Sequence, residues 1–243
     1  MKFTFKHTKL ACYGSYMSSA VAINFPPVLF IFFQKQFGLS LADLGFLISL
    51  NFGVQMLTDI VGASVIDKKL TYKQAAVTAD SLVASGLILL GILPMFMSAK
   101  FLALMLATIV YSVGCGLLEV IISPITEAIP EDGKASNMAL LHSFYCWGQM
   151  VAILFTTLLL IVTGSENWWI ISILWALVPA STALLFSKVP VNTLPKEESK
   201  PSFALFKNKF FIIFLLLMTA SGAAEISVAQ CAIQDRGLLW GEQ

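Results

Sequence analysis

Charged residues are scarce in this chain. Asp, Glu, Lys and Arg make up 12% of its 243 residues, against about 25% in a typical soluble domain. Hydrophobic residues make up 58%, and the mean hydropathy is +0.84. The formal net charge is only +1, so the chain has no excess of basic residues that would indicate a nucleic-acid partner. This composition excludes an ordinary soluble domain and predicts an all-α, polytopic transmembrane helical bundle.

Cysteine pairs and common catalytic motifs are also missing. The chain has no C-x-x-C pair, and its cysteines lie in or beside apolar stretches, so they indicate neither a disulfide framework nor a zinc site. It has no H-E-x-x-H and no G-x-S-x-G motif. An intramembrane enzyme is therefore the least favoured function class, and we expect no metal and no cofactor. The cysteines are Cys12, Cys115, Cys146 and Cys231.

Seven apolar stretches are long enough to cross a bilayer. A helix needs about 20 residues to cross the hydrocarbon core, and each stretch is near or above that length. The first stretch is long and carries Pro26 and Pro27 in its second half, so we expect a retained span and not a cleaved secretory signal. The predicted spans are 10–33, 42–66, 74–97, 101–129, 135–163, 168–187 and 210–233.

The lysines between these spans predict the orientation of the chain. Twelve lie on the side of the N-terminus, and only Lys35 and Lys100 lie on the other side. Positive residues concentrate in cytoplasmic loops, so we expect a cytoplasmic N-terminus in a multi-pass protein of the cell (inner) membrane. The twelve are Lys2, Lys6, Lys9, Lys68, Lys69, Lys73, Lys134, Lys188, Lys196, Lys200, Lys207 and Lys209.

The loop of residues 188–208 predicts the one clear domain boundary. It holds Pro190, Pro195 and Pro201 together with a charged run, which is typical of a solvated linker. We therefore expect a six-helix unit over residues 1–187, a cytoplasmic linker over 188–208 and one further helix within 209–243.

An acidic residue, Glu119, lies near the middle of the fourth span. A carboxyl group at the centre of a membrane helix costs about 2.5–3.5 kcal/mol and usually faces a bundle interior or a wet cavity. Ser112, Cys115, Gly116 and Ser123 recur with Glu119 at steps of three and four, so one small and polar face turns toward other helices. Glu119 is predicted either to line a translocation path or to be a protonated structural carboxyl between helices.

The second span carries another polar stripe, formed by Asn51, Gln55 and Asp59 at steps of four. Asn51 and Gln55 lie near mid-membrane and are candidates for hydrogen bonds to a substrate, with an interhelical amide pair as the alternative. Asp59 lies nearer the cytoplasmic end, and we expect a structural role for it. Asp80, in the first turns of the third span, is expected to have a structural role and to reach the cytoplasmic interface or Lys73.

The fifth span is dense in polar and aromatic residues from His142 to Gln149. His142, Trp147 and Gln149 are candidates for stacking on, or hydrogen bonding to, a small polar solute. His142 is either a proton relay with Glu119 or a residue of the headgroup boundary. In the first span only Asn24 offers a comparable polar group within the membrane.

The loop after the second span reads D-K-K-L-T-Y-K. An Asp at the end of a span, followed at once by basic residues, resembles the loop motif of the major facilitator superfamily. The K-K-L-T-Y-K run is similar to the same loop in the fucose-permease branch of that superfamily. Such a loop can dock on the neighbouring half of a transporter and lock one conformation, or it is simply a solvated loop. The residues of this motif are Asp67, Lys68, Lys69 and Lys73.

The fourth span adds to this resemblance. Its run G-x-G-x-x-E-x-x-x-S-P, from Gly114 to Pro124, resembles the G-x-G-x-x-E-x-x-x-N-P of fucose-permease-like transporters. In that family the Glu is associated with proton coupling or sugar binding, and Glu119 is the matching residue, whereas Ser123 replaces the usual Asn. The seventh span resembles the opening helix of the second half of these permeases, which makes Glu225 a candidate second carboxylate of the site.

The resemblance covers residues 10–230 and implies a six-helix N-terminal half followed by the first helix of the second half. We expect a permease for a small polar solute, sugar-like, that works by alternating access, with proton coupling as an open point. The bilayer, the solute and protons are the expected partners. We also expect that the chain is truncated and that function needs the missing C-terminal half. A non-transporting membrane scaffold or receptor is the alternative.

Overall fold

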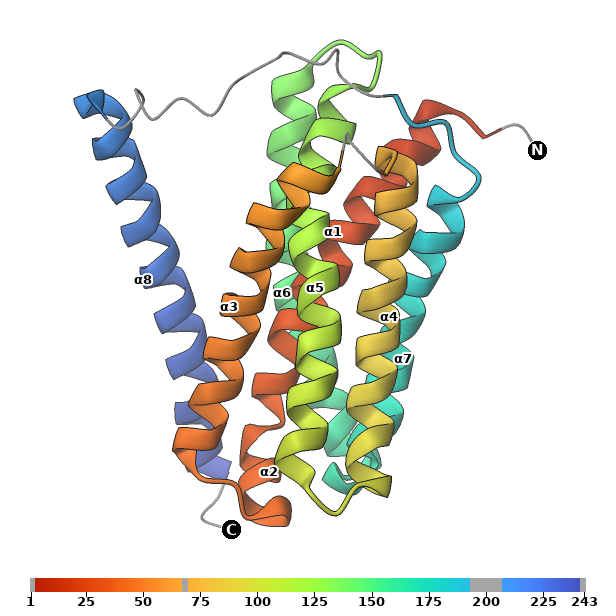
Figure 1. Cartoon of the computed structure of the whole chain (residues 1–243). Helices are drawn as coiled ribbons and strands as arrows, with labels where there is room; N and C mark the ends of the chain where they lie inside the picture. Colours follow the sequence, from red (N-terminus) through yellow and green to blue (C-terminus); the bar gives the residue numbers. More distant parts are fainter. Residues whose placement is uncertain (1–2, 67–69, 193–206, 241–243) are drawn as a thin grey trace. The chain divides into compact units, whose positions relative to one another are not determined.

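Helices form most of the chain in the computed structural model. It describes residues 3–66, 70–192 and 207–240, without the side chains of 63–65 and 225–240. Within this part of the chain no strand occurs, apart from one isolated bridge between Ile66 and Leu70. The helices, shown in Figure 1, are α1 (Phe5–Val28), α2 (Phe30–Phe37), α3 (Leu41–Val65), α4 (Tyr72–Phe96), α5 (Lys100–Glu127), α6 (Lys134–Thr163), the short η1 (Ser165–Asn167), α7 (Trp168–Phe186) and α8 (Lys209–Trp240).

The helices match the predicted spans. Among the described residues, five are long and apolar enough to cross a membrane, and six if α1 and α2 count as one bent span. These two helices meet at 43°, just after Pro26 and Pro27, because proline has no N–H for the helical ladder. The all-α, polytopic transmembrane fold expected from composition is therefore confirmed.

The chain separates into two compact units, residues 1–194 and 195–243, which we describe separately. The first unit contains α1 to α7. The second contains α8, which continues to Trp240 and so runs past the predicted end of the seventh span at residue 233.

Two helix starts are fixed by capping boxes in the sequence. The Ser40 hydroxyl accepts a hydrogen bond from the Asp43 N–H at 3.1 Å, and the Ser40 N–H donates to the Asp43 carboxylate at 2.9 Å. Thr71 and Gln74 form the same pair at the start of α4, at 3.2 and 3.1 Å. Each box satisfies N–H groups that the first turn leaves unpaired, so α3 and α4 begin at these points.

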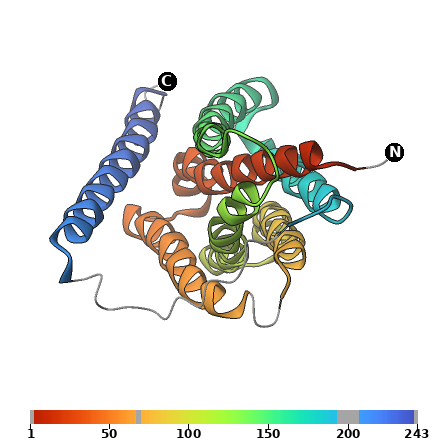
Figure 2. The ribbon, with the colours of Figure 1, turned by 90° about the horizontal axis from the view of Figure 1, so that it is seen from above.

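The packing of α1 to α7 has the pattern of two three-helix repeats. The main contacts join α3 with α5, α1 with α6, α4 with α5, α4 with α7, and α1 with α7. The first repeat is α1, α3 and α4, and the second is α5, α6 and α7, matched in that order. The contact of α3 with α5 then corresponds to that of α6 with α1. The contact of α4 with α5 corresponds to that of α7 with α1. Figure 2 shows α1 with α5, α6 and α7 around it. This arrangement is typical of secondary transporters.

Two glycines place α5 between its neighbours. A Cβ added at Gly114 would lie 2.7 Å from the Ala79 carbonyl oxygen of α4, and one at Gly116 would lie 2.9 Å from the Gln55 carbonyl oxygen of α3. Both distances are too short for any side chain, so the two glycines allow close approach on two sides of α5. They stand just ahead of Glu119, which is therefore held on a tightly packed helix.

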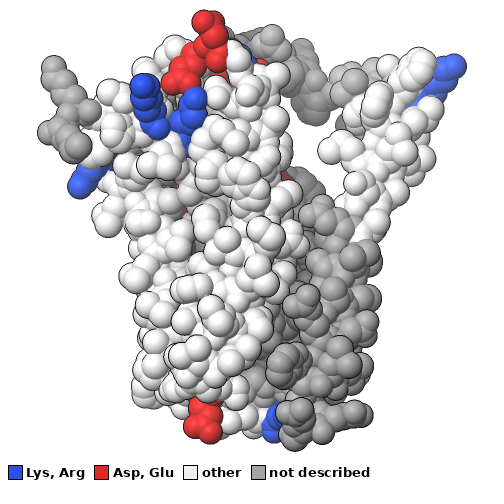
Figure 3. Space-filling view, turned by 180° about the vertical axis from the view of Figure 1, so that it is seen from behind, with Lys and Arg blue, Asp and Glu red and all other residues white. Residues whose placement is uncertain are grey.

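Charged side chains on one outer face of this unit lie at its two ends. On the face seen in Figure 3, the described Lys, Arg, Asp and Glu side chains gather at the two ends of the helices, and the wide band between them is uncharged. Among the five unbent spans, α5 is the most enclosed and α6 the least. A band without charge is what a helical bundle presents to lipid.

Candidate functional site

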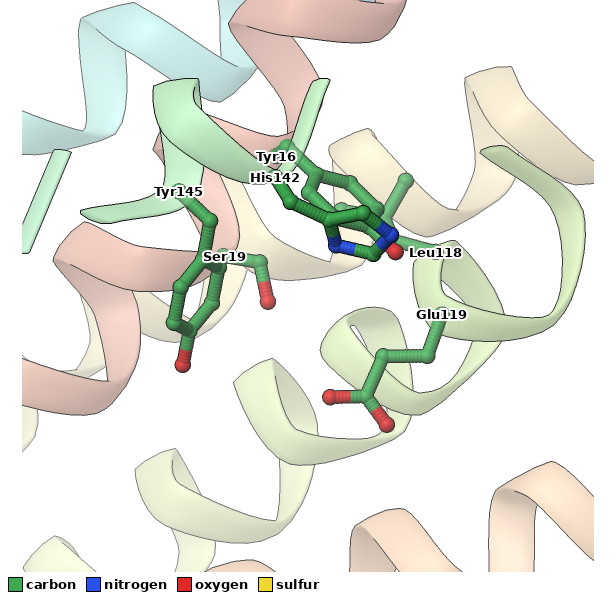
Figure 4. A pocket seen from close by; sticks show the side chains of 6 residues that line it. All are labelled: Tyr16, Ser19, Leu118, Glu119, His142 and Tyr145. Atoms are coloured by element: carbon green, nitrogen blue, oxygen red, sulfur yellow. The ribbon is translucent and has the colours of Figure 1, made fainter. Parts of the chain in front are cut away.

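A cavity of about 310 Å³ opens between α1, α5 and α6. Figure 4 shows the side chains around it, with the Glu119 carboxyl on the α5 side and Tyr145 on the α6 side. It brings together helices from both three-helix repeats. The lining residues are Tyr16, Ser19, Leu118, Glu119, His142 and Tyr145.

Helical spacing explains why these residues share one cavity. Tyr16 and Ser19 are three residues apart on α1, and His142 and Tyr145 are three residues apart on α6, so each pair lies on one helix face. Because α1 packs on both α5 and α6, these faces meet beside Glu119.

Tyr16 lies at the centre of this group. Its hydroxyl is 3.4 Å from the Ser123 hydroxyl of α5. Its ring meets the rings of His142 and Tyr145 edge to face, with centroids 5.7 and 6.1 Å apart. Sequence reasoning did not select Tyr16 or Tyr145 as site residues, because neither a motif nor a charge marks them.

The Glu119 side chain is exposed in this unit and turns toward a second carboxyl group. The carboxyls of Glu119 and Asp59, from α3, are within hydrogen-bonding reach of each other. Asp59 also lies against Gly116, where an added Cβ would come within 3.1 Å of its Oδ1. A hydrogen bond between two carboxyl groups needs a proton on one of them. Asp59 was expected to be structural; its position links it to Glu119.

The predicted substrate ligands Asn51 and Gln55 are buried, at 4% and 3% exposure. Gln55 Nε2 donates to Asn51 Oδ1 at 2.8 Å, and the Ser112 hydroxyl of α5 donates to the same oxygen at 2.7 Å. The amide pair therefore lies within α3, and the Ser112 hydroxyl makes the bond between helices. Neither residue lines the cavity.

A second polar link joins α1 to α6. Asn24 is buried, donates to the Ala20 carbonyl at 2.8 Å, and accepts from Gln149 Nε2 at 3.3 Å. Trp147 is half-exposed and contacts the Phe144 ring, at a centroid distance of 5.1 Å. Of the candidates on α6, His142 is the one that lines the cavity.

Four of the predicted site residues fall on parts of the chain that the structure does not describe. Asp67, Lys68 and Lys69 of the loop motif lie outside the described residues, as does the side chain of Glu225 on α8. Lys73 is described, and its Nζ donates to the Val189 carbonyl at 3.0 Å.

The expectation that Asp80 reaches the cytoplasmic interface or Lys73 is wrong. Asp80 is fully buried and accepts a hydrogen bond from the Ser15 hydroxyl at 2.7 Å. Its side chain ends inside the bundle, where α4 meets α1 and α7.

The cavity offers one carboxyl, two phenols, an imidazole and a hydroxyl. These groups can hydrogen-bond a polar solute, stack on it and exchange a proton. Among the described residues, no group of three or more His, Cys, Asp or Glu side chains could hold a metal ion.

The fold and the cavity define a class of protein. Paired three-helix repeats around a polar cavity form one half of a secondary membrane transporter. The profile of the Major Facilitator Superfamily matches residues 12–238, and the chain belongs to this superfamily. No curated protein matches the chain.

Solved structures show the same fold at low sequence identity. The chain is similar to the peptide transporter POT in complex with sulfate, with a TM-score of 0.65, 15% identity and coverage of 95% of this chain and 46% of that one. A POT family transporter in complex with a thioalcohol-conjugated peptide gives a TM-score of 0.62, 15% identity and coverage of 90% and 47%. A bacterial homologue of the human drug peptide transporters PepT1 and PepT2 gives a TM-score of 0.62 and 17% identity, with coverage of 98% of this chain and 52% of that one. The chain thus spans about half the length of these transporters.

Proposed function

We propose that this chain supplies one six-helix half of a permease for a small polar solute, and that the cavity between α1, α5 and α6 is its share of the solute path. The polar cavity beside Glu119 is the observation that carries this proposal. Alternating access moves one half against the other around a site between them. Transport on this scheme needs a second six-helix half in addition to α1 to α7.

The lining favours a sugar-like solute. Aromatic rings pack against the C–H faces of a sugar, and their polar tips, with a carboxylate, bind its hydroxyls. Tyr16, Tyr145 and His142 offer rings of this kind, and Glu119 and Ser19 offer oxygen atoms. The sequence resemblance to fucose-permease-like transporters points the same way. The solved neighbours are named as peptide transporters, but an identity of 15–17% supports a common fold only.

The carboxyl pair of Glu119 and Asp59 is the proposed coupling site. With one proton the two groups hydrogen-bond across the α3–α5 contact; without it two like charges face each other and repel. A solute that binds Glu119 competes with Asp59 for that carboxyl, so binding and protonation are linked. His142 lines the same cavity and is the proposed relay for the proton.

We further propose that the chain lies in the cell (inner) membrane with its N-terminus in the cytoplasm. The distribution of twelve lysines against two across the predicted loops supports this orientation.

A ligand screen tests the proposal directly. The melting temperature of the full chain in nanodiscs is measured with monosaccharides, nucleosides and dipeptides. The two pH values, about 5.5 and 7.5, lie on either side of the usual titration range of His. A ligand that binds only the folded form raises the melting temperature. We expect monosaccharides to give a shift that depends on pH and that Glu119→Gln removes.

The matched control is Glu127→Gln, because Glu127 is exposed at the end of α5; it should keep the shift. Dipeptides as the only stabilising class would overturn the sugar proposal. Counter-flow uptake is measured in proteoliposomes that hold the chain together with a second six-helix half, and a pH-independent shift without uptake there would favour a receptor over a permease.

A further inference from the structure

A second buried carboxyl group, Asp80 on α4, lies outside the cavity. Its side chain is fully buried where α4 meets α1 and α7. From α1, the Ser15 hydroxyl donates to Asp80 Oδ2 at 2.7 Å. From α7, the Thr182 side chain is the second polar neighbour of the carboxyl.

The hydrogen-bond directions around Asp80 show where a proton belongs. The Thr182 hydroxyl already donates to the Pro179 carbonyl at 2.9 Å, so it has no second proton to offer. Asp80 Oδ1 is buried and receives no hydrogen bond from any described residue. If Oδ1 itself carries a proton, Thr182 Oγ1 is the neighbouring acceptor toward which that proton can turn.

No cation compensates a charge at this position. The titratable groups that face Asp80 are the thiols of Cys12 on α1 and Cys115 on α5. Among the described side chains the only ion pair joins Lys9 and Glu131, elsewhere in the bundle. An ionised carboxylate in such a place loses its hydration without gaining a partner, which costs several kcal/mol.

We infer that Asp80 is a protonated acid that connects three helices, accepting from Ser15 on α1 and donating to Thr182 on α7. It is a proton-binding site separate from the Glu119 and Asp59 pair. This inference goes beyond the proposed transport function and does not depend on it.

The connection also orients the cavity. Ser15 and Tyr16 are consecutive on α1, so they point about 100° apart around the helix axis. While Ser15 is bonded to Asp80 on one side, Tyr16 reaches Ser123 on another. Asp80 is thus a positioning residue: it sets the rotation of α1, and this rotation places Tyr16 and Ser19 in the cavity.

Asparagine can imitate a neutral acid but not a carboxylate. In Asp80→Asn, the amide oxygen can accept from Ser15 and the amide N–H can donate to Thr182, so the pattern of the protonated acid is kept. Asp80→Leu has similar size, but it removes the acceptor of the Ser15 hydroxyl and the proposed donor to Thr182 Oγ1. Ser15→Ala removes only the link to α1.

Infrared spectra and thiol labelling of the full chain in nanodiscs test this inference. The spectrum of the wild type at pH 6 (about two units above the free pKa of Asp) should contain the C=O band of a protonated carboxyl that is missing in Asp80→Asn. Cys12, fully buried on the same side of α1, reports the position of α1. Its labelling by N-ethylmaleimide should stay at the wild-type rate in Asp80→Asn and rise on the order of tenfold in Asp80→Leu and in Ser15→Ala.

Labelling of the exposed Cys146 on α6 is the internal control and should not change. If Asp80→Asn removes no protonated-carboxyl band, Asp80 is ionised and the inference fails. It also fails if Asp80→Asn labels at Cys12 as fast as Ser15→Ala, or if Ser15→Ala leaves Cys12 protected. Where Asp80→Leu does not fold, the other two variants still decide.

Discussion

The Tyr16 hydroxyl on α1 lies 3.4 Å from the Ser123 hydroxyl on α5, and the two side chains join helices from different three-helix repeats. Ser123 occupies the place where the similar motif of fucose-permease-like transporters has Asn. The structure gives this replacement a physical role. The short serine side chain leaves its hydroxyl within reach of the tyrosine, whose ring lies in the cavity wall.

Tyr16→Phe tests that link. The variant keeps the ring and removes one hydrogen bond between helices, so we expect a loss of about 1 kcal/mol in the free energy of unfolding, or ~2–4 °C in melting temperature. The control is Tyr13→Phe. Tyr13 is buried in the same helix and stacks on Phe144, but its hydroxyl has no hydrogen-bond partner among the described residues. Equal melting shifts for the two variants would contradict a role for the Tyr16 hydroxyl.

The carboxyl pair of Glu119 and Asp59 predicts a pH dependence. The shared proton stabilises the α3–α5 contact at low pH, and its loss at higher pH leaves two facing negative charges. The folded chain should therefore lose stability as the pH rises through deprotonation of the pair, because the folded state binds more protons than the unfolded state does there. We expect Glu119→Gln and Asp59→Asn each to flatten this part of the stability curve.

The double variant separates the pair from independent effects. If the two carboxyls share one proton, removing the second gives little further change, so the single effects should not add. The measurement is a series of melting curves between about pH 5 and 8, the range in which most proteins are most stable. Additive single effects would show that the two groups titrate separately.

The orientation of Glu119 could be predicted from sequence because helical periodicity fixes which residues share a face. The small residues at Cys115, Gly116 and Ser123 placed it toward other helices, and it lies in a cavity wall. The same rule placed Asn51, Gln55 and Asp59 on one face of α3 but could not say what that face meets. The structure shows two outcomes on that face: Asn51 and Gln55 bond to each other, whereas Asp59 faces Glu119.

Tertiary contacts account for the parts that the sequence did not reveal. Tyr16 belongs to the site only because α1 crosses both α5 and α6, and periodicity within one helix holds no record of that crossing. The same applies to Asp80. Its position in the first turns of its span suggested the membrane surface, but Asp80 is buried where α4 meets α1 and α7. Span ends also moved by a few residues where caps and prolines, and not hydropathy, fix the boundary.

Asn51→Ala distinguishes a structural amide from a substrate ligand. The substitution leaves the Gln55 amide and the Ser112 hydroxyl without their shared acceptor inside the bundle, which should cost about 1–3 kcal/mol. Ser49→Ala on the same helix is the control, because Ser49 is exposed and bonds only to the Gly45 carbonyl of its own helix. Unfolding by sodium dodecyl sulfate gives both values. A loss of solute binding at unchanged stability would instead assign Asn51 to the solute.

Lys73 predicts the behaviour of the segment that follows α7. Lys73 Nζ donates to the Val189 carbonyl and the Thr8 hydroxyl donates to the Pro190 carbonyl, at 3.0 and 2.7 Å. Lys73→Met removes one of these two ties, so amide hydrogen exchange in residues 187–192 should become several-fold faster. Lys6→Met, which changes an exposed lysine, should leave it unchanged. Equal exchange in both variants would mean that the tie does not hold the segment.

The packing of α3 on α5 can be tested with one glycine at the contact and one away from it. Gly116→Ala places a methyl group 2.8 Å from Thr58 Cβ and 2.9 Å from the Gln55 carbonyl oxygen, so α3 must move away, at a cost of about 1–3 kcal/mol. At Gly53 in α3 an added Cβ meets nothing within 4 Å, so Gly53→Ala should stabilise the chain by about 0.5–1 kcal/mol through helix propensity alone. Because Asp59 lies against Gly116, only Gly116→Ala should also weaken the pH dependence that depends on the carboxyl pair. If both alanines stabilise the chain equally, α3 and α5 do not make the close contact described.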